Sequence, residues 1–396
     1  MRNDVMISTA RRESESLMDA ARRLHPMIRE HAEVVERNRR LAPAVVGALL
    51  EARLFHMAVP RAFGGCEINP MEMITCIEEL ARADASTGWC VAKATCSTLV
   101  ARNLPAPVLH EMFDDQKFIG ACVLASKGKA IAVPGGIRLT GRWSYATTSE
   151  DCSWIALGTV VCDGAELRKM PNGQPARYLA LLRRGEFHVR DTWHVSGLAG
   201  SGSHDVEVIE QFIPEARVMS LTSERTLTTT LFSFPIFALL RVLDAAVALG
   251  VGRRAIEEFR DLAKHKPSPW GGNLRDQLGA QQLVGQAEGM VRSARAFLLD
   301  AVGEAWQATQ GAATPAIEHR VMMTLAATEA VARTTAAVDL MYSAGGATSM
   351  MTDHPMQRLF RDMHTITQDV AVHHKNYEYV GKHVLELLDL ETAMRL

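Results

Sequence analysis

The chain has 396 residues, of which 47% are hydrophobic and 22% are charged, so it can bury a large core in two or three folding units. Its formal net charge of -2 at pH 7 provides no basic excess to attract nucleic acid or an anionic lipid surface. We therefore expect neither intrinsic disorder nor a nucleic-acid partner.

The cysteines and the N-terminal segment indicate where the protein works. Seven cysteines occur at irregular spacings, and an odd number matches neither a disulfide framework nor a zinc pattern. The opening segment MRNDVMISTARRESES lacks the apolar stretch of a signal peptide, and no later run reaches about 18 apolar residues. We expect a cytoplasmic protein with reduced thiols and no membrane partner.

Two periodicities divide the chain. From about residue 13 to residue 109, apolar residues recur at steps of three and four, which predicts helices. From about 118 to 218 the period becomes two, and a glycine turn at 134–136 predicts a β-hairpin. An exposed loop is expected at 163–176. Further strands are expected at 154–161, 178–182, 187–193 and 205–213.

The helical pattern resumes at Pro235, with long helices expected at 237–263, 273–309 and 316–343. The prolines at 267 and 269 should end the first of these. Alanine-rich, weakly charged helices need burial on more than one face, which predicts a bundle and an oligomer. The resulting division is a helical domain at 1–115, a β domain at 116–225 and a helical bundle at 226–396.

Glycines and tryptophans suggest a place for a flat ring, although neither dinucleotide nor phosphate-loop motifs occur. The segment 197–203, GLAGSGS, lies between expected strands, where small residues let backbone and hydroxyl donors approach a ring or a phosphate. A flexible turn is the alternative. Trp89, Trp143 and Trp193 suit an apolar slot or an ordinary core, whereas Trp154 lies inside a strand pattern and is expected in the core.

Histidines gather near the C-terminus, among several aspartates. Asp369 and His373 are expected on one helix as neighbours four residues apart, with His364 on another side. No third ligand follows at a dependable spacing, so acid–base or structural roles are favoured over a metal site.

Five stretches together resemble the acyl-CoA dehydrogenase superfamily, and most closely its branch of flavin-dependent monooxygenases. They are PRAFGG at 60–65, DASTGW at 84–89, GRWSYAT at 141–147, WHVSGLAGSGSHD at 193–205 and RLFRD at 358–362. The resemblance implies an α+β multidomain fold with a helical N-terminal domain, a central β-barrel or sandwich domain and a C-terminal four-helix bundle. It also implies a homotetramer.

The same resemblance implies the chemistry. Reduced flavin, FMN or FAD, would come from a separate NAD(P)H-dependent reductase and react with O2 to give a C4a-hydroperoxyflavin. The product would be a hydroxylated small aromatic or heterocyclic compound, or an N-oxygenated amine. Alternatives are α,β-desaturation of an acyl-CoA with Asp369 as the base, and a scaffold without catalytic activity.

Positions carried over from the family give the candidate site residues. The catalytic candidates are Asp369, Thr147 and His373, and Arg361 with Asp362 matches a shared pair of structural character. Substrate contacts are expected from Trp89, Cys122 and His364. The flavin is expected to contact Trp143, Ala146, Thr147, Thr148, Trp193, Ser201, Ser203, Gly345 and Gly346.

Two departures from the branch matter for function. Thr147 and Thr148 stand where Ser-Gly is frequent, so Thr147 keeps a hydroxyl for flavin N5 while Thr148 adds bulk. Asp369 stands where a histidine is frequent. A carboxylate there is either a base whose pKa burial has raised or an anion that holds a cationic amine.

Overall fold

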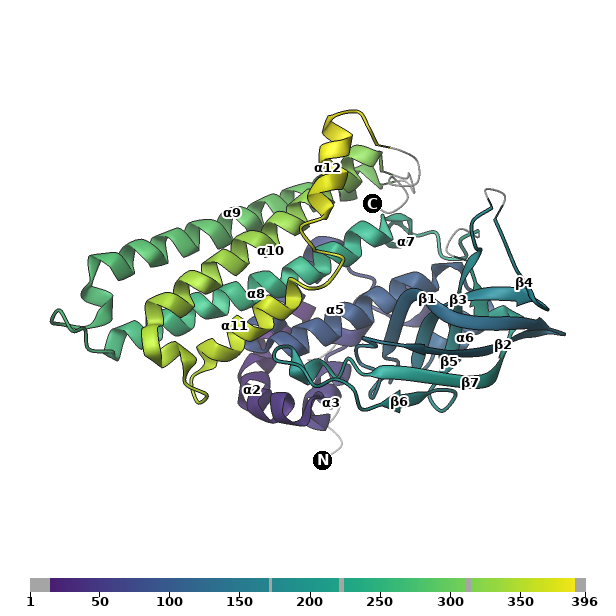
Figure 1. The fold of residues 1–396 in the computed structure, drawn as a ribbon, viewed down its shortest axis with the longest axis horizontal. Coiled ribbons are helices and arrows are strands. Elements are labelled where there is room, and N and C mark those ends of the chain that lie inside the picture. The colour runs from purple at the N-terminus through teal and green to yellow at the C-terminus, as the bar shows by residue number, and fades with distance from the viewer. Residues whose placement is uncertain (1–14, 171–172, 221–223, 311–314, 389–396) are drawn as a thin grey trace.

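The computed structural model describes residues 15–388 except 171–172, 221–223 and 311–314. Figure 1 shows a bundle of long helices at one end, a curved sheet at the other, and the N-terminal helices beside both. None of the helices in the described ranges combines the length and apolar character that a membrane crossing requires.

The N-terminal region is helical, as predicted. Its α-helices are α2 (Leu17–Asn38), α3 (Pro43–Glu51), α4 (Pro70–Ala83), α5 (Ala85–Val100) and α6 (Ala106–Phe113). Asp84 begins α5 by accepting the Thr87 backbone N–H at 2.8 Å, an N-cap that satisfies a free helix donor. Every residue of α5 except Lys93 is buried, so this helix lies at the centre of the fold.

One mixed sheet forms the middle of the chain. Its strands are β1 (Gly120–Val133), β2 (Gly136–Trp143), β3 (Trp154–Asp163), β4 (Glu166–Leu167), β5 (Arg177–Arg183), β6 (His188–Arg190), β7 (Asp205–Pro214) and β8 (Val218–Met219). The path runs β6-β7-β2-β1-β3-β5-β8, with β4 paired to β3. Only β1 and β3 pair in parallel among these ladders. The predicted hairpin is confirmed, since Val133 pairs with Gly136, while the expected loop at 163–176 contains β4.

The C-terminal region is helical again and contains α7 (Thr230–Ser233), α8 (Ile236–His265), α9 (Leu278–Ala308), α10 (Ile317–Gly345), α11 (Pro355–Ile366) and α12 (Asn376–Val384). The first long helix stops before Pro267, as predicted. Helix α8 contacts α4 and α5 as well as α9, α10 and α11, which joins the N-terminal helices to the bundle. The proposed domain boundaries, 115/116 and 225/226, fall in the connections between these regions.

The prediction that Asp369 and His373 share a helix is wrong. Helix α11 ends at Ile366, and residues 367–375 form turns before α12 begins at Asn376. The Asp369 carboxylate accepts the Ala371 backbone N–H at 2.8 Å, a local bond that competes with the helical pattern.

Candidate functional site

A row of three hydroxyls joins the turn after β2 to the loop before β7. Thr147 Oγ1 lies 2.8 Å from Ser203 Oγ, which lies 2.8 Å from Ser201 Oγ. The Ala146 backbone N–H donates to the His204 carbonyl at 2.9 Å and fixes the two segments together. All three hydroxyl residues are buried. The structure thus brings together the two stretches expected to contact flavin, and we call Thr147, Ser201 and Ser203 the hydroxyl row.

The backbone of this turn is strained. Tyr145 and Thr148 have φ values of 67° and 63°, a region that a β-branched residue such as threonine rarely enters. Thr148 Oγ1 donates to the Thr147 carbonyl at 2.6 Å and so holds the turn. The turn leaves the Tyr145 ring 72% exposed, edge-on to Trp193 with ring centres 6.1 Å apart. Strain of this kind gathers at functional sites.

The expected tryptophans have different environments. Trp143 is fully buried and donates from its indole to the Gly158 carbonyl at 2.7 Å. Gly128 leaves room for that ring, because a Cβ there would lie 2.2 Å from Trp143 Cζ2. Trp193 is half-buried and donates to the Leu198 carbonyl at 3.1 Å. Trp154 belongs to the core, as predicted.

The arginine–aspartate pair of α11 holds the glycine-rich loop. The Leu198 backbone N–H donates to Asp362 Oδ1 at 2.6 Å, and Arg361 pairs with Glu36 at 2.6 Å. A Cβ on Gly197 would lie 2.2 Å from the Arg361 carbonyl oxygen, so glycine lets the loop approach α11. Burial raises the pKa of Asp362 to about 7, although the Leu198 N–H opposes this. These contacts indicate a structural role for the pair.

Asp362 should make the fold lose stability as the pH rises. A carboxyl whose folded pKa is about 7 keeps its proton between roughly pH 4 and 7, where the unfolded chain has released it. The Asn side chain of Asp362→Asn still accepts the Leu198 N–H but does not titrate. We expect the free energy of unfolding of this variant to fall by about 1 kcal/mol less per pH unit over this range than that of the parent protein. Urea unfolding at pH 5, 6 and 7 measures it. The exposed Asp353→Asn is the control, and equal slopes in all three proteins would contradict the assignment.

A second cluster surrounds the one charged residue of α5. Lys93 Nζ donates to Asp244 Oδ2 of α8 at 2.8 Å and to Asp369 Oδ2 at 3.0 Å. The same ammonium lies 4.1 Å from the centre of the Trp89 ring, within range of a cation–π interaction. We call Lys93, Asp244 and Asp369 the lysine triad.

Burial and charge fix the protonation of the triad. Asp244 is fully buried, its Oδ1 has no hydrogen-bond partner in the described chain, and burial raises its pKa to about 7 against the pull of Lys93. Burial would also raise the pKa of Asp369, but the Lys93 ammonium and the Ala371 N–H lower it below its ordinary value. The two carboxylates raise the pKa of Lys93 in spite of burial. At neutral pH, Lys93 is therefore an ammonium and Asp369 a carboxylate.

One face of α5 connects the two clusters. Ser86, Trp89, Cys90, Lys93 and Ser97 follow at steps of three and four and share this face. Cys90 Sγ donates to the Ser201 carbonyl at 3.6 Å. The hydroxyl row and the lysine triad therefore flank a common stretch of helix.

The structure gathers some predicted residues and separates others. Trp89 and Asp369 contact Lys93. Burial raises the pKa of the Cys122 thiol to about 12, and the charge of Lys93 partly opposes this rise. His364 Nε2 instead lies 2.9 Å from Asp339 Oδ1, and His373 stacks on His374 with ring centres 4.0 Å apart.

Gly345 and Gly346 lie elsewhere in the fold. They end α10, with Gly346 at a φ of 58°, and Lys266 Nζ donates to the Gly345 carbonyl at 2.6 Å. Figure 1 shows this end of the bundle remote from the sheet.

Lys93, Asp244 and Tyr145 were missed from the sequence, and two of them had a detectable signal. Lys93 is the single charge in α5, and Asp244 is the single acid in the first half of α8. A charged side chain in a largely apolar stretch of helix requires a buried partner. The exposure of Tyr145 depends on the backbone turn and had no such signal.

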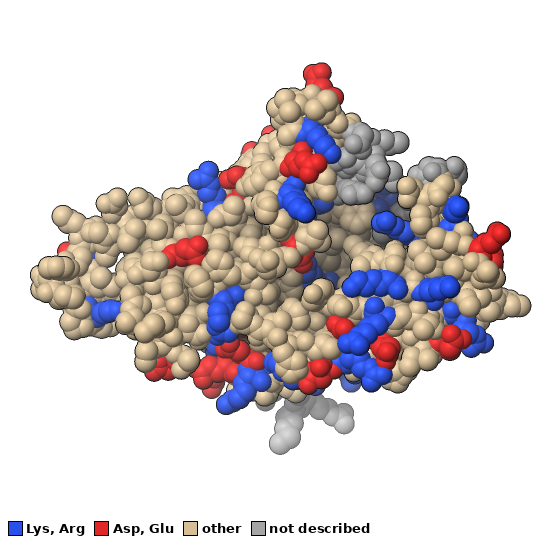
Figure 2. Space-filling view, viewed as in Figure 1, with Lys and Arg blue, Asp and Glu red and all other residues tan. Residues whose placement is uncertain are grey.

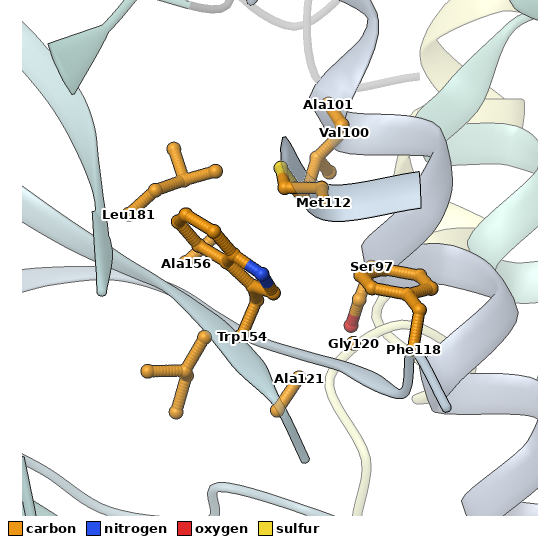
Figure 3. Close-up of a pocket in the computed structure, with 11 residues that line it drawn as sticks. Ser97, Val100, Ala101, Met112, Phe118, Gly120, Ala121, Trp154, Ala156 and Leu181 are labelled. Atoms are coloured by element: carbon orange, nitrogen blue, oxygen red, sulfur yellow. The ribbon is translucent and has the colours of Figure 1, made fainter. Parts of the chain in front are cut away.

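A small apolar pocket lies one turn farther along α5. Ser97 Oγ donates to the Lys93 carbonyl at 2.8 Å, and Ser97 lines this pocket together with Phe118, Trp154 and Leu181. Figure 3 shows the Trp154 and Phe118 rings beside it, and no residue that lines it is charged. It therefore offers an apolar shape and no acid–base group.

Figure 2 shows the surface recessed between α12 and the sheet, with basic side chains on the sheet.

Two models of one protein family match this chain. The family model for the acyl-CoA dehydrogenase C-terminal domain matches residues 242–374, and that for the N-terminal domain matches residues 11–104. Together the two matches cover more than half of the chain.

Relatives match over nearly the whole length. Indole-3-acetate monooxygenase of Pseudomonas putida is 27% identical over 360 residues, which are 89% of this chain and 90% of the relative. The oxygenase subunit HsaA of a flavin-dependent monooxygenase from Mycobacterium tuberculosis is 24% identical over 387 residues, 91% of this chain and 92% of the relative. The structure of XiaF from Streptomyces sp. in complex with FADH2 and glycerol superimposes with a TM-score of 0.88, at 27% identity and 98% coverage of both chains.

Proposed function

Because the chain belongs to the acyl-CoA dehydrogenase superfamily, we propose that it is the oxygenase component of a two-component flavin-dependent monooxygenase. The observation that carries this proposal is the hydroxyl row beside the exposed Tyr145 ring. Reduced flavin, FMN or FAD, would come from a separate NAD(P)H-dependent reductase, and the second substrate is O2.

The residues of the turn fit a flavin ring. Tyr145 presents an aromatic face, Trp193 stands at its edge, and the hydroxyl row supplies donors without adding charge. Bound reduced flavin supplies the electrons that activate oxygen, while the protein supplies position and polarity. Thr147 Oγ1 is the proposed hydrogen-bond partner of flavin N5. Trp143, Ala146 and Thr148 shape the turn from within.

We propose a homotetramer, and the position of Gly345 and Gly346 gives a reason for at least a second copy of the chain. Lys266, which holds Gly345, follows the last turn of α8, about 30 Å along the helix from Asp244. The flavin ring system is much shorter than this stretch of helix, so one chain does not place both ends of it at one ring. A role for the glycine turn in flavin binding therefore requires a neighbouring subunit, which we propose to be another copy of this chain.

The substrate is proposed to lie beside Trp89, Cys122 and Asp369, where it would be hydroxylated as a small aromatic or heterocyclic compound or N-oxygenated as an amine. We give His364 and His373 no role in the reaction, because His364 pairs with Asp339, while His373 contacts His374 and accepts the Lys375 backbone N–H. Desaturation of an acyl-CoA needs a strong base, and Lys93 makes Asp369 a weaker one. The oxygenase is therefore favoured.

Anaerobic titration with reduced and oxidised FMN and FAD tests the proposal. We expect tighter binding of the reduced form and negligible NAD(P)H oxidation by the isolated chain, since it lacks a dinucleotide motif. Rapid NAD(P)H oxidation would contradict the two-component assignment. Copurified FAD that is reduced by an acyl-CoA would instead support a dehydrogenase.

Thr147→Val should uncouple the enzyme. Valine is nearly isosteric but has no hydroxyl to form a hydrogen bond with N5, so more of the reduced flavin should be oxidised with release of hydrogen peroxide. The measurement is peroxide formed per reduced flavin oxidised in the presence of substrate. Thr140→Val on the exposed side of β2 is the matched control. A peroxide yield equal to that of the parent protein would remove Thr147 as the hydrogen-bond partner of N5.

A further inference from the structure

The carboxylate of Asp369 is held in place but only partly covered. Its Oδ2 accepts from Lys93 and its Oδ1 accepts the Ala371 N–H, so both oxygens are oriented. The side chain is nevertheless 24% exposed, whereas that of Asp244 on the other side of Lys93 has no exposed surface. Of the two carboxylates in the triad, Asp369 is thus the one that can meet a ligand.

The charges around Asp369 are balanced before any ligand arrives. Lys93 pairs with Asp369, and Arg241 of α8 opposes only in part the rise that burial causes in the pKa of Asp244. The third direction of the Lys93 ammonium faces the Trp89 ring. A cationic amine bound at Asp369 would be separated from the Lys93 ammonium by one carboxylate only, and the two like charges would repel each other.

We propose that Lys93 is the positioning residue that sets the substrate class of this site. By fixing and neutralising Asp369, it makes that carboxylate a hydrogen-bond acceptor for the ring N–H of an uncharged aromatic substrate, and it disfavours protonated amines. This inference rests on the proposed function and narrows it. Trp89, which stacks beside the ammonium, provides the aromatic wall.

Three small probes separate the possibilities: indole has the ring N–H, 1-methylindole lacks it, and tryptamine adds an ammonium. Isothermal titration calorimetry of the full-length protein at pH 7.5 measures their dissociation constants without turnover. We expect indole to bind roughly tenfold more tightly than either of the others, about 1.4 kcal/mol. The proposal would be overturned if tryptamine bound most tightly, if indole and 1-methylindole bound with equal affinity, or if no probe bound.

Lys93→Met should reverse the ranking, because Asp369 would then carry an uncompensated charge and favour tryptamine over indole by roughly tenfold. If Lys93 only supported the fold, its substitution would weaken the binding of all three probes together. Lys93→Met/Asp244→Asn, which removes the buried carboxylate as well, should show the same reversal if the single variant is poorly folded. Lys264→Met, which breaks an exposed pair with Asp261, should leave the parent ranking intact.

The flavin titration is independent of these results. An unchanged ranking in a folded Lys93→Met protein that still binds reduced flavin would overturn this inference and leave the proposed function standing. The expected reversal in a protein that fails to bind reduced flavin would overturn the proposed function alone.

Discussion

Replacing Lys93 by methionine is expected to lower the free energy of unfolding by about 3 kcal/mol. Asp244 is fully buried, and Lys93 is its only hydrogen-bond partner among the described residues. Removing the ammonium leaves a buried carboxyl group that must either take up a proton or remain charged without compensation, and both are costly. Chemical denaturation at a fixed protein concentration measures the loss.

A compensating variant identifies the cause. Lys93→Met/Asp244→Leu replaces the buried pair by apolar groups, which is often close to neutral, so most of the lost stability should return. The exposed variant Lys264→Met should stay within about 0.5 kcal/mol of the parent. A single variant as stable as the parent, or a double variant no better than the single one, would show that the triad does not hold α5 to α8.

Replacing Asp369 by asparagine is expected to reduce product formation at least tenfold, about 1.4 kcal/mol of transition-state stabilisation, with folding and flavin affinity nearly intact. The amide keeps the shape and one acceptor but loses the charge that Lys93 fixes. Product formed per reduced flavin, with a reductase supplied, is the measurement. The exposed Asp261→Asn is the matched control. If Asp369 were a solvated turn residue, the change would be close to silent.

Asp369→His separates the possible roles of this position. A base role should survive in part, because neutral imidazole accepts protons near pH 7. A role in holding a cationic amine should be lost whenever the histidine is protonated. The positive charge of Lys93 lies beside this position and disfavours protonation of the imidazole, which should therefore remain largely neutral in the folded protein. Product yields measured across pH distinguish these roles, and yields unchanged in both Asp369 variants would remove Asp369 from the site.

Elements with a strong local pattern were predicted well from the sequence. The period of two gave β2, β3, β5 and β7 close to their observed bounds, and the period near 3.6 gave α8 and α10. Both periods express which side of one element is buried, and this is a property of neighbouring residues. The helix expected around Asp369 does not form, and the Asp369 carboxylate instead accepts the Ala371 backbone N–H. The periodicity of apolar residues does not reveal such a bond.

The sequence by itself determined the order of helical and β regions, because their periodicities are local properties. Its resemblance to the superfamily indicated the two stretches that form the hydroxyl row. Only the tertiary structure decided the lysine triad, whose aspartates lie 151 and 276 residues from Lys93 along the chain. A lone lysine in a buried helix indicates that a partner exists. Which carboxylate is that partner, and which of the two stays ionised, depends on burial and distance, and both arise only when α5, α8 and the turn after α11 pack together.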